Sequence, residues 1–254
     1  MQYLGGKSRT RNEIAGYLNW LRAEMAKERG TAVPYWEPFV GAGWVLEKIK
    51  GQPIYASDAN GALIALWRAV QKGWQPPTVV TEEDYQRAKD GLMTAYETAF
   101  IGFGVSHSGR WFGGYAKPNP AEGHSNYAET AHVSLLTKIN KSDNVTFFTA
   151  DFLTCYIPAY GCLIYCDPPY AGTAGYKGLP KFNSKAFWQR VRWLENNGHT
   201  VVVSEYAAPD DFSCVLEMPT LTDVATKNGK RERRTERLFR YGQHANVKPK
   251  LFNF

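Results

Sequence analysis

The chain has 254 residues, of which 44% are hydrophobic and 21% charged, and it carries a formal net charge of +6. This composition is typical of a globular protein with one sizeable core, or one large domain with a smaller insertion. It argues against a membrane protein, because no apolar run approaches the ~20 residues that a membrane helix needs, and against a secreted one, because the amino-terminus carries no signal segment. We therefore expect a cytoplasmic protein, and the positive charge favours a polyanionic partner.

The four cysteines form no metal-binding pattern. Cys155, Cys162, Cys166 and Cys214 include no Cys-x-x-Cys pair and stand in no Cys/His cluster. We interpret them as reduced thiols and expect no metal site.

The first predicted helix covers residues 10–28, because apolar side chains recur there with helical spacing and Gly30 offers a stop. The preceding segment, Gly5-Gly6-Lys7-Ser8, does not fit a phosphate-binding loop, since Met1 stands where that motif needs its first glycine. We interpret it as an amino-terminal loop that offers a lysine to a carboxylate. The alternative is a solvated chain end.

Two strands that end in acids come next. Tyr35-Trp36-Glu37 should end the first strand, and a turn with Gly41 and Gly43 should lead into a helix that begins at Trp44. Glycines at such a turn let the backbone approach a ligand closely. The second predicted strand, residues 53–58, ends at Asp58, and an acid in this place commonly accepts hydrogen bonds from ribose hydroxyls. Alternatively, Asp58 caps the helix predicted over residues 60–71.

Residues 75–135 break this alternation of strands and helices. Pro76-Pro77 marks a boundary, and a capping box at residues 81–84 predicts a helix over 82–100 with Tyr85, Leu92 and Tyr96 turned inward. A second helix is predicted over 126–139.

Between these helices lies a stretch rich in glycine, aromatic and basic residues, residues 102–117. Its Arg110, Trp111 and Lys117 could enter a DNA groove or wedge between bases. The alternative is a connecting loop without such a role.

A third strand is predicted over residues 145–148, followed by Asp151-Phe152. A fourth, Leu163–Cys166, is short and apolar, and it must stop at Asp167 because Pro168 and Pro169 cannot continue a ladder. In an open parallel sheet, this carboxyl edge is where ligands bind.

The side chains at this strand end suit chemistry on an aromatic amine, whose lone pair is delocalised into its ring. The Asp167 carboxylate and the Pro168 carbonyl could both accept the amine hydrogens and free the lone pair, while the ring of Tyr170 stacks on the base. The alternative is a strand followed by a plain proline turn.

The last part of the chain predicts a loop over residues 172–183 that could close over the site, a helix over 184–197 and strands over 200–204, 214–218 and 238–241. Asn228-Gly229 suggests a hairpin tip. The basic side chains around it suit contacts to DNA phosphates, namely those of Lys230, Arg231, Arg233 and Arg234. The alternative is a solvated charged hairpin.

Three motifs carry a resemblance to a known family. The sequence Asp-Pro-Pro-Tyr at 167–170 resembles the catalytic motif of amino-group DNA methyltransferases. Residues 3–7 resemble the motif of that family which binds the methionine moiety, and residues 37–43 resemble its glycine-rich cofactor motif. Their order, with a recognition region before the catalytic motif, resembles that of the Dam-type DNA adenine methyltransferases.

The resemblance implies a class I methyltransferase-like three-layer α/β sandwich with a mixed seven-stranded sheet and an antiparallel last strand. It implies a catalytic domain of residues 1–74 and 141–254 and a mostly helical DNA-recognition insertion of residues 75–140. The implied activity is methyl transfer from S-adenosylmethionine to the 6-amino group of an adenine flipped out of double-stranded DNA, by a monomer without a metal.

The resemblance also implies roles for single residues. Asp167, Pro168, Pro169 and Tyr170 would be catalytic. The cofactor or the wall of its pocket would be held by Tyr3, Gly6, Lys7, Pro38, Phe39, Gly41, Gly43, Asp58, Asp151 and Phe152, together with Asp167. Residues 106–115 lack the asparagine-rich pattern associated with a GATC site, so the recognised sequence stays open. Methylation of RNA or cytosine, or a catalytically silent nucleic-acid-binding protein, are the alternatives.

Overall fold

The structure is a computed structural model that describes residues 1, 6–118, 126–140, 144–169, 182–225 and 231–244, and the side chains of these residues outside 220–234. Within this part of the chain the strands form one seven-stranded sheet in the order β3-β2-β1-β4-β5-β7-β6. The bounds of the strands are β1 Tyr35–Glu37, β2 Ile54–Asp58, β3 Val145–Thr149, β4 Leu163–Cys166, β5 Thr200–Glu205, β6 Phe212–Ala225 and β7 Arg231–Tyr241.

The sheet is mixed, as expected. Strands β3, β2, β1, β4 and β5 are parallel to one another, and β7 is antiparallel to both β5 and β6. The five parallel strands therefore present their carboxyl ends at one edge. The mixed seven-stranded sheet and its antiparallel β7 confirm the predicted class I methyltransferase-like fold.

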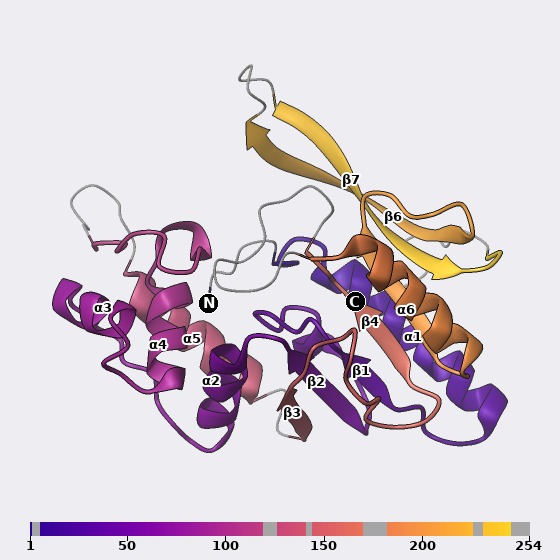
Figure 1. Cartoon of the computed structure of the whole chain (residues 1–254), viewed down its shortest axis with the longest axis horizontal. Coiled ribbons are helices and arrows are strands. Elements are labelled where there is room, and N and C mark those ends of the chain that lie inside the picture. The colour runs from indigo at the N-terminus through magenta and orange to yellow at the C-terminus, as the bar shows by residue number, and fades with distance from the viewer. Residues whose placement is uncertain (2–5, 119–125, 141–143, 170–181, 226–230, 245–254) are drawn as a thin grey trace.

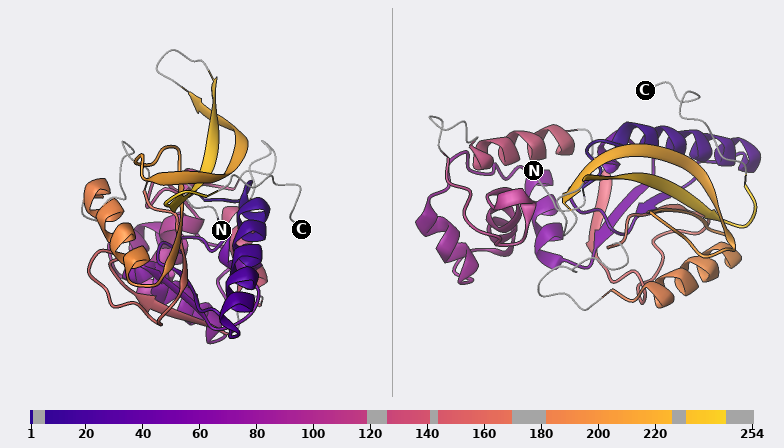
Figure 2. Two further views of the ribbon diagram at one scale, coloured as in Figure 1. Left: turned by 90° about the vertical axis from the view of Figure 1, so that its right-hand side faces the viewer. Right: turned by 90° about the horizontal axis from the view of Figure 1, so that it is seen from above.

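Two hydrophobic cores cover the two faces of the sheet, because successive side chains of a strand point to opposite faces. Along β4, Leu163 and Tyr165 join one core, and Ile164 and Cys166 join the other. Helices α1 (Arg11–Arg29) and α2 (Gly61–Gln71) pack on the first face, and α6 (Ser184–Asn196) packs on the second. Figure 2 shows α1 and α6 on opposite sides of the sheet, which makes three layers.

The helices of residues 75–140 lie beyond the β3 edge of the sheet (Figure 1). They are α3 Glu82–Lys89, α4 Ala95–Gly104 and α5 Tyr127–Ile139, with a short 3-10 turn, η2, at His107–Gly109. Phe100, Phe103 and Leu135 bury their side chains in the same core as α2. The insertion is thus anchored to the sheet domain through a shared core, and its role in DNA recognition stays a prediction.

The single helix predicted over 82–100 is wrong, because the chain forms two helices there. The predicted capping box of Thr81 is present, but Thr94 begins α4 with a second capping box. Gly91 adopts a φ of 76° between the two helices. Leu92 consequently lies in the connection, and it is 66% exposed rather than turned inward.

The helix predicted from Trp44 is also wrong, since only one 3-10 turn, η1 at Leu46–Lys48, forms there. The β-branched Val45 and Ile49 and the nearby Gly51 and Pro53 leave no stretch suited to a longer helix.

The last two strands are longer than predicted. β6 and β7 pair antiparallel from Phe212 with Tyr241 to Ala225 with Arg231, so most of the predicted basic loop belongs to β7. Over much of their length, β6 and β7 pair only with each other. This part of the two strands extends from the body of the molecule as a two-stranded ribbon (Figure 1). Such a ribbon needs no continuous apolar run, which is why apolar patterning located only its inner ends. The predicted tip, Asn228-Gly229, lies outside the described residues.

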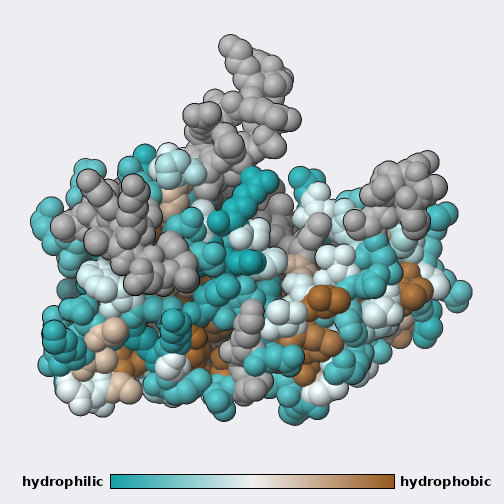
Figure 3. Space-filling model, turned by 180° about the vertical axis from the view of Figure 1, so that it is seen from behind, coloured by the Kyte–Doolittle hydropathy of each residue, from teal (hydrophilic) through white to brown (hydrophobic). Residues whose placement is uncertain are grey.

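Seen from behind, the surface is mainly hydrophilic, with hydrophobic side chains in small separate groups (Figure 3). In the described part of the chain, none of the helices combines the length and the apolar character needed to cross a membrane.

Candidate active site

Acidic side chains gather at the carboxyl edge of the parallel strands. Asp167 follows β4, Glu37 ends β1 and Asp58 ends β2. Since β1 pairs in parallel with both β2 and β4, these three acids lie along one edge of the sheet. The predicted position of Asp167 at the end of a buried strand is confirmed.

Lys7 joins this edge from the amino-terminal segment. Its Nζ lies 2.6 Å from Oδ1 of Asp167 and 3.3 Å from Oε1 of Glu236 on β7. The Lys7 side chain is only 7% exposed. Burial alone would lower the pKa of Lys7, but the two carboxylates outweigh burial and raise it above its usual value. Lys7 is therefore charged at neutral pH and bridges two acids from distant parts of the chain.

Glu236 is held at this place by the hydroxyl of Ser204. Ser204 Oγ donates to Glu236 Oε1 at 2.8 Å, from the adjacent strand β5. Tyr165 of β4 lies in the same environment, where burial and then the charges of Asp167 and Glu236 raise the pKa of its hydroxyl well above the usual value.

Glu37 is a buried acid with a neutral partner. Tyr35 donates its hydroxyl proton to Glu37 Oε2 at 2.9 Å. Burial raises the pKa of Glu37 to about 8, with a further contribution from the charge of Asp167, against the opposing effects of the Tyr35 hydrogen bond and Lys138. Glu37 is thus mostly protonated at neutral pH.

The glycine turn after β1 is fixed by Asp58. The amide of Gly41 donates to Asp58 Oδ2 at 3.2 Å, and the amide of Asn60 donates to Oδ1 at 2.9 Å. Burial raises the pKa of Asp58 to about 6, although both hydrogen bonds oppose the rise. The alternative role for Asp58 as a helix cap is wrong, because the side chain of Asn60 caps α2.

The glycines of this turn occupy positions that a side chain would not suit. Gly41 and Gly43 have φ values of 48° and 64°, in the left-handed region. A Cβ on Gly43 would stand 3.0 Å from the ring of Trp67. The ring of Trp67 therefore packs closely against Gly43, and the turn carries no side chain at Gly41 or Gly43.

Lys138 supports the same turn from α5. Its Nζ donates to the carbonyl oxygen of Ala42 at 2.6 Å and lies 3.3 Å from the centroid of the Trp44 ring. Burial lowers the pKa of Lys138 to about 7, although the charge of Glu47 opposes this. A side chain of the insertion thus contacts the predicted cofactor turn directly.

Aromatic rings pack beside this turn on the α6 side of the sheet. The ring of Phe39 lies 5.2 Å from Phe152 and 6.0 Å from Phe187, between centroids. Pro38 and Phe152 are buried, whereas Asp151 is exposed and accepts the Leu153 amide at 2.9 Å. Asp151 therefore acts as a turn acid in this structure, and its contact with a cofactor stays a prediction.

The remaining predicted site residues outside the insertion fall into three groups. Gly6 is exposed beside Lys7, and Pro168 and Pro169 follow Asp167 with Pro168 buried. Outside the described residues lie Tyr3, Tyr170, Lys230 and nearly all of the predicted closing loop at 172–183. Arg231, Arg233 and Arg234 stand on the backbone of β7, in the ribbon.

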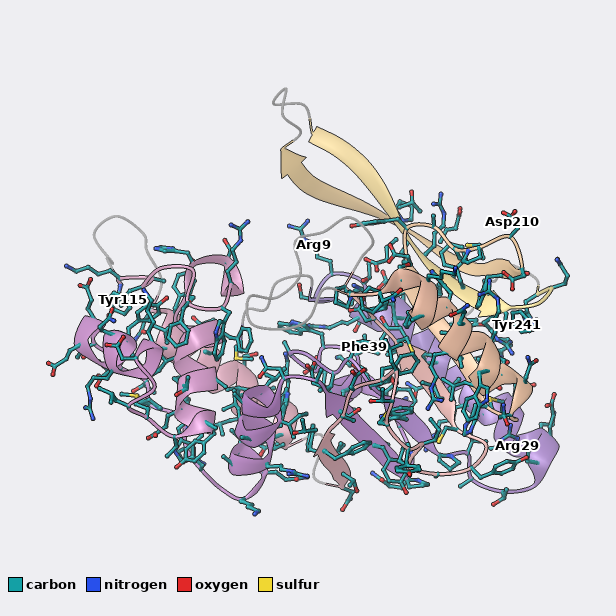
Figure 4. The ribbon with its side chains drawn as sticks, in the orientation of Figure 1. Arg9, Arg29, Phe39, Tyr115, Asp210 and Tyr241 are labelled. Atoms are coloured by element: carbon teal, nitrogen blue, oxygen red, sulfur yellow. The ribbon has the colours of Figure 1, made fainter. Side chains whose placement is uncertain are left out.

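The predicted DNA-binding residues of the insertion lie apart from the acids. Arg110 and Lys117 are exposed. The ring of Trp111 packs 4.6 Å from that of Phe103, and a Cβ on Gly102 would meet Trp111 at 2.8 Å. A wedging role for Trp111 would require this packing to open. Figure 4 places Tyr115, from the same stretch, on the far side of the insertion from Phe39.

Among the residues that the structure describes, none of the groupings of His, Cys, Asp and Glu could hold a metal ion.

Comparison with protein families gives one match. Residues 3–100 match the model of the D12 class N6 adenine-specific DNA methyltransferases. The match supports a methyltransferase. It covers less than half of the chain, and it includes Lys7, the glycine turn and Asp58 but ends before Asp167. A comparison with curated proteins finds no match.

Two solved structures illustrate the likeness to known folds. Precorrin 8w decarboxylase from Methanobacterium thermoautotrophicum is 13% identical, with 88% of this chain and 90% of that chain covered and a TM-score of 0.34. SMU.472, provisionally described as a methyltransferase and complexed with SAH, is 10% identical, with 84% and 49% covered and a TM-score of 0.31. At these TM-scores neither similarity supports a conclusion about this chain, and the fold assignment rests on the observed sheet.

Sequence reasoning missed three residues of this site, Glu236, Ser204 and Lys138, which belong to none of the motifs. Glu37 was placed at the end of a strand but was given no role of its own. A signal for Glu236 is present, because Glu236 stands two residues before the apolar Leu238 in a strand and so shares the buried face of Leu238.

Proposed function

We propose that this protein transfers a methyl group from S-adenosylmethionine to the 6-amino group of an adenine in DNA. The observation that carries the proposal is Asp167, held by Lys7 at the end of β4, directly beside β1 and its glycine turn. A methyl donor on that turn and an amine at Asp167 would be neighbours at one edge of the sheet. The family match of residues 3–100 supports the same activity.

Asp167 and the carbonyl of Pro168 would accept the two amine hydrogens, so that the nitrogen lone pair points at the methyl carbon. Tyr170 would stack on the base. The cofactor supplies an electrophilic methyl group on a cationic sulfur. The new N–C bond forms as the C–S bond breaks, the sulfur retains the bonding electrons, and the surplus amine proton passes to solvent.

The residues of the cofactor edge fit a ligand of this kind. The backbone at Gly41 and Gly43 permits close approach. Asp58 would accept hydrogen bonds from ribose hydroxyls, and Phe39 and Phe152 present rings beside the turn. Lys7, Asp167 and Glu236 together carry one positive and two negative charges, which suits a cationic donor.

DNA would be bound outside this edge. In the proposal, residues 75–140 recognise the sequence through exposed basic side chains such as Arg110 and Lys117, and the ribbon of β6 and β7 contacts phosphates. The catalytic domain of residues 1–74 and 141–254 then receives a flipped adenine. Motif order of the Dam type, a monomeric state and a cytoplasmic location belong to the same proposal.

Incubation of DNA with tritiated S-adenosylmethionine tests the proposal. Incorporation of label, followed by nucleoside analysis that finds N6-methyladenine, is the expected result. Label in cytosine, or label only with RNA, would move the activity to one of the alternative substrates. The absence of label with DNA and RNA, despite binding of both, would indicate a catalytically silent binding protein.

A further inference from the structure

Lys7 stands between two carboxylates rather than one. Its Nζ is 2.6 Å from Asp167 and 3.3 Å from Glu236, and the side chains of these acids are 18% and 10% exposed. Ser204 donates to Glu236 at 2.8 Å and keeps the second carboxylate turned toward Lys7. The family match ends far before β7 and so includes neither Ser204 nor Glu236.

The shorter of these two contacts creates a conflict for the proposed reaction. A carboxylate that accepts hydrogens from a substrate amine works best when its negative charge is available to that amine. In this structure Asp167 is the nearer partner of the Lys7 ammonium. The positive charge of Lys7 offsets the negative charge that the amine would need. Lys7 therefore needs a second anion within reach if Asp167 is to serve the amine.

Glu236 meets this requirement. We propose that Glu236 is a positioning residue that acts through Lys7 and takes the larger share of its charge while Asp167 accepts the amine. This inference rests on the proposed function and adds a role for β7 to it. Glu236 contacts neither the amine nor the methyl group, and its effect reaches the reaction only by way of Lys7.

The charge of the cluster supports this role. Among these three side chains, the charge of Lys7 offsets that of one carboxylate, and Glu236 supplies a second negative charge. Methyl transfer moves positive charge from the sulfur to the amine nitrogen, and a negative site stabilises that charge as it develops. The neighbouring Glu37 adds little negative charge at neutral pH, because burial raises its pKa to about 8.

Glu236→Gln is the central variant, because glutamine keeps an oxygen for Ser204 and removes only the charge. The measurement is the single-turnover rate of DNA methylation at saturating S-adenosylmethionine, with cofactor affinity and thermal stability measured beside it. We expect the rate to fall about tenfold or more, which is less than the roughly 100-fold or greater loss of a direct electrostatic contact to a transition state, because Glu236 acts through Lys7. Glu236→Asp, which keeps the charge, should recover part of the rate.

Glu217→Gln is the matched control. Glu217 lies on β6 in an exposed ion pair with Arg237, with Nε and Oε1 2.8 Å apart, so the change removes a similar charge from the same ribbon outside the site. Its rate should equal that of the wild type. An equal loss in Glu217→Gln and Glu236→Gln would show a general effect of ribbon charge and would overturn the proposal.

A double-mutant cycle with Lys7→Met separates the proposed role from a merely structural one. Lys7→Met removes the side chain through which Glu236 is proposed to act, so Glu236→Gln should then change the rate by less than about threefold. The same large loss in both backgrounds would overturn the inference, as would an unchanged rate in Glu236→Gln alone. A wild-type chain that transfers no methyl group would overturn the proposed function, and this inference with it.

Discussion

Lys138 of α5 donates a hydrogen bond to the carbonyl oxygen of Ala42, across 96 residues of sequence, at a distance of 2.6 Å. The contact ties the helical insertion to the glycine turn that we propose as the cofactor site. The Lys138 ammonium also lies over the ring of Trp44, 3.3 Å from its centroid. The Arg11 guanidinium lies over the same ring at 4.9 Å and is paired with Glu47. The turn is therefore supported by a buried lysine in a group of charged neighbours.

The buried Lys138 should make stability depend on pH. Its pKa is about 7 in the folded chain, against an ordinary value of 10.5, so the unfolded chain binds more protons between these values. Stability should therefore rise with pH from about 7 toward 10, by at most about 1.4 kcal/mol per pH unit for this one group. Urea unfolding at pH 7 and pH 9 measures the slope.

Lys138→Met removes this group and should flatten the rise relative to the wild type. Lys117→Met, at an exposed position of the same insertion, is the control and should leave the slope unchanged. Equal slopes in the wild type and Lys138→Met would contradict the lowered pKa.

Arg22 should contribute strongly to stability. Its guanidinium donates to the carbonyl oxygens of Val33, Lys50 and Pro53, at 2.7, 2.6 and 3.0 Å, and so joins α1 to the segments on either side of β1. Arg22→Met leaves these carbonyls without that donor and should cost about 3 kcal/mol or more of unfolding free energy.

Arg192 provides the comparison, because the side chains of its pair with Asp211 are 31% and 40% exposed, far more than that of the buried Arg22. Arg192→Met should cost no more than about 1 kcal/mol. Denaturant titration measures both variants, and similar losses in the two would show that the carbonyl contacts of Arg22 add nothing.

Asp58→Asn tests the cofactor edge. The change leaves an acceptor for the amide of Gly41 but weakens the proposed contact with ribose hydroxyls, so the affinity for S-adenosylmethionine should fall by about 1–3 kcal/mol. Asp210→Asn, at an exposed position near Tyr241 on the α6 side of the molecule (Figure 4), should have no effect. Calorimetry that finds wild-type affinity in Asp58→Asn would remove Asp58 from the site.

The basic part of β7 should govern binding to all DNA sequences alike. Neutralising Arg231, Arg233 and Arg234 together should lower the slope of log affinity against log salt by about 1 for each residue that contacts a phosphate. Binding isotherms at several salt concentrations, on two unrelated duplexes, measure this slope. An unchanged slope would show that the ribbon does not contact DNA.

The sheet and its active edge could be predicted from sequence because their signals are local. Two prolines after an apolar run placed Asp167 at a strand end, and acids after short apolar runs placed Glu37 and Asp58. Long-range pairs left no such signal. The ion pair between Lys7 and Glu236 joins the two ends of the chain, and only the folded sheet brings them together.

The differences from expectation also have physical causes. Trp111 lies in a glycine-rich stretch that looks exposed, yet Gly102 opens the space in which its ring packs, and its role in DNA binding stays a prediction. The helix over 82–100 was predicted from the capping box at residues 81–84 and from the apolar side chains after it, although Thr94 and Glu97 already offered a second capping box. Apolar patterning also predicted too short a strand at β7. Much of β7 consists of Arg and Glu residues and is paired mainly with β6.

The central claim is that Asp167 accepts a hydrogen of the substrate amine during methyl transfer. The Asp167→Asn variant tests this claim most directly. Asparagine keeps the shape of the side chain and removes the charge, so cofactor binding should stay within about threefold of wild type while methyl transfer falls by about 100-fold or more. The measurement is single-turnover transfer of tritiated methyl groups to DNA, with cofactor affinity measured by calorimetry on the same preparation. Transfer within a few-fold of the wild-type rate, at normal cofactor affinity, would contradict the account.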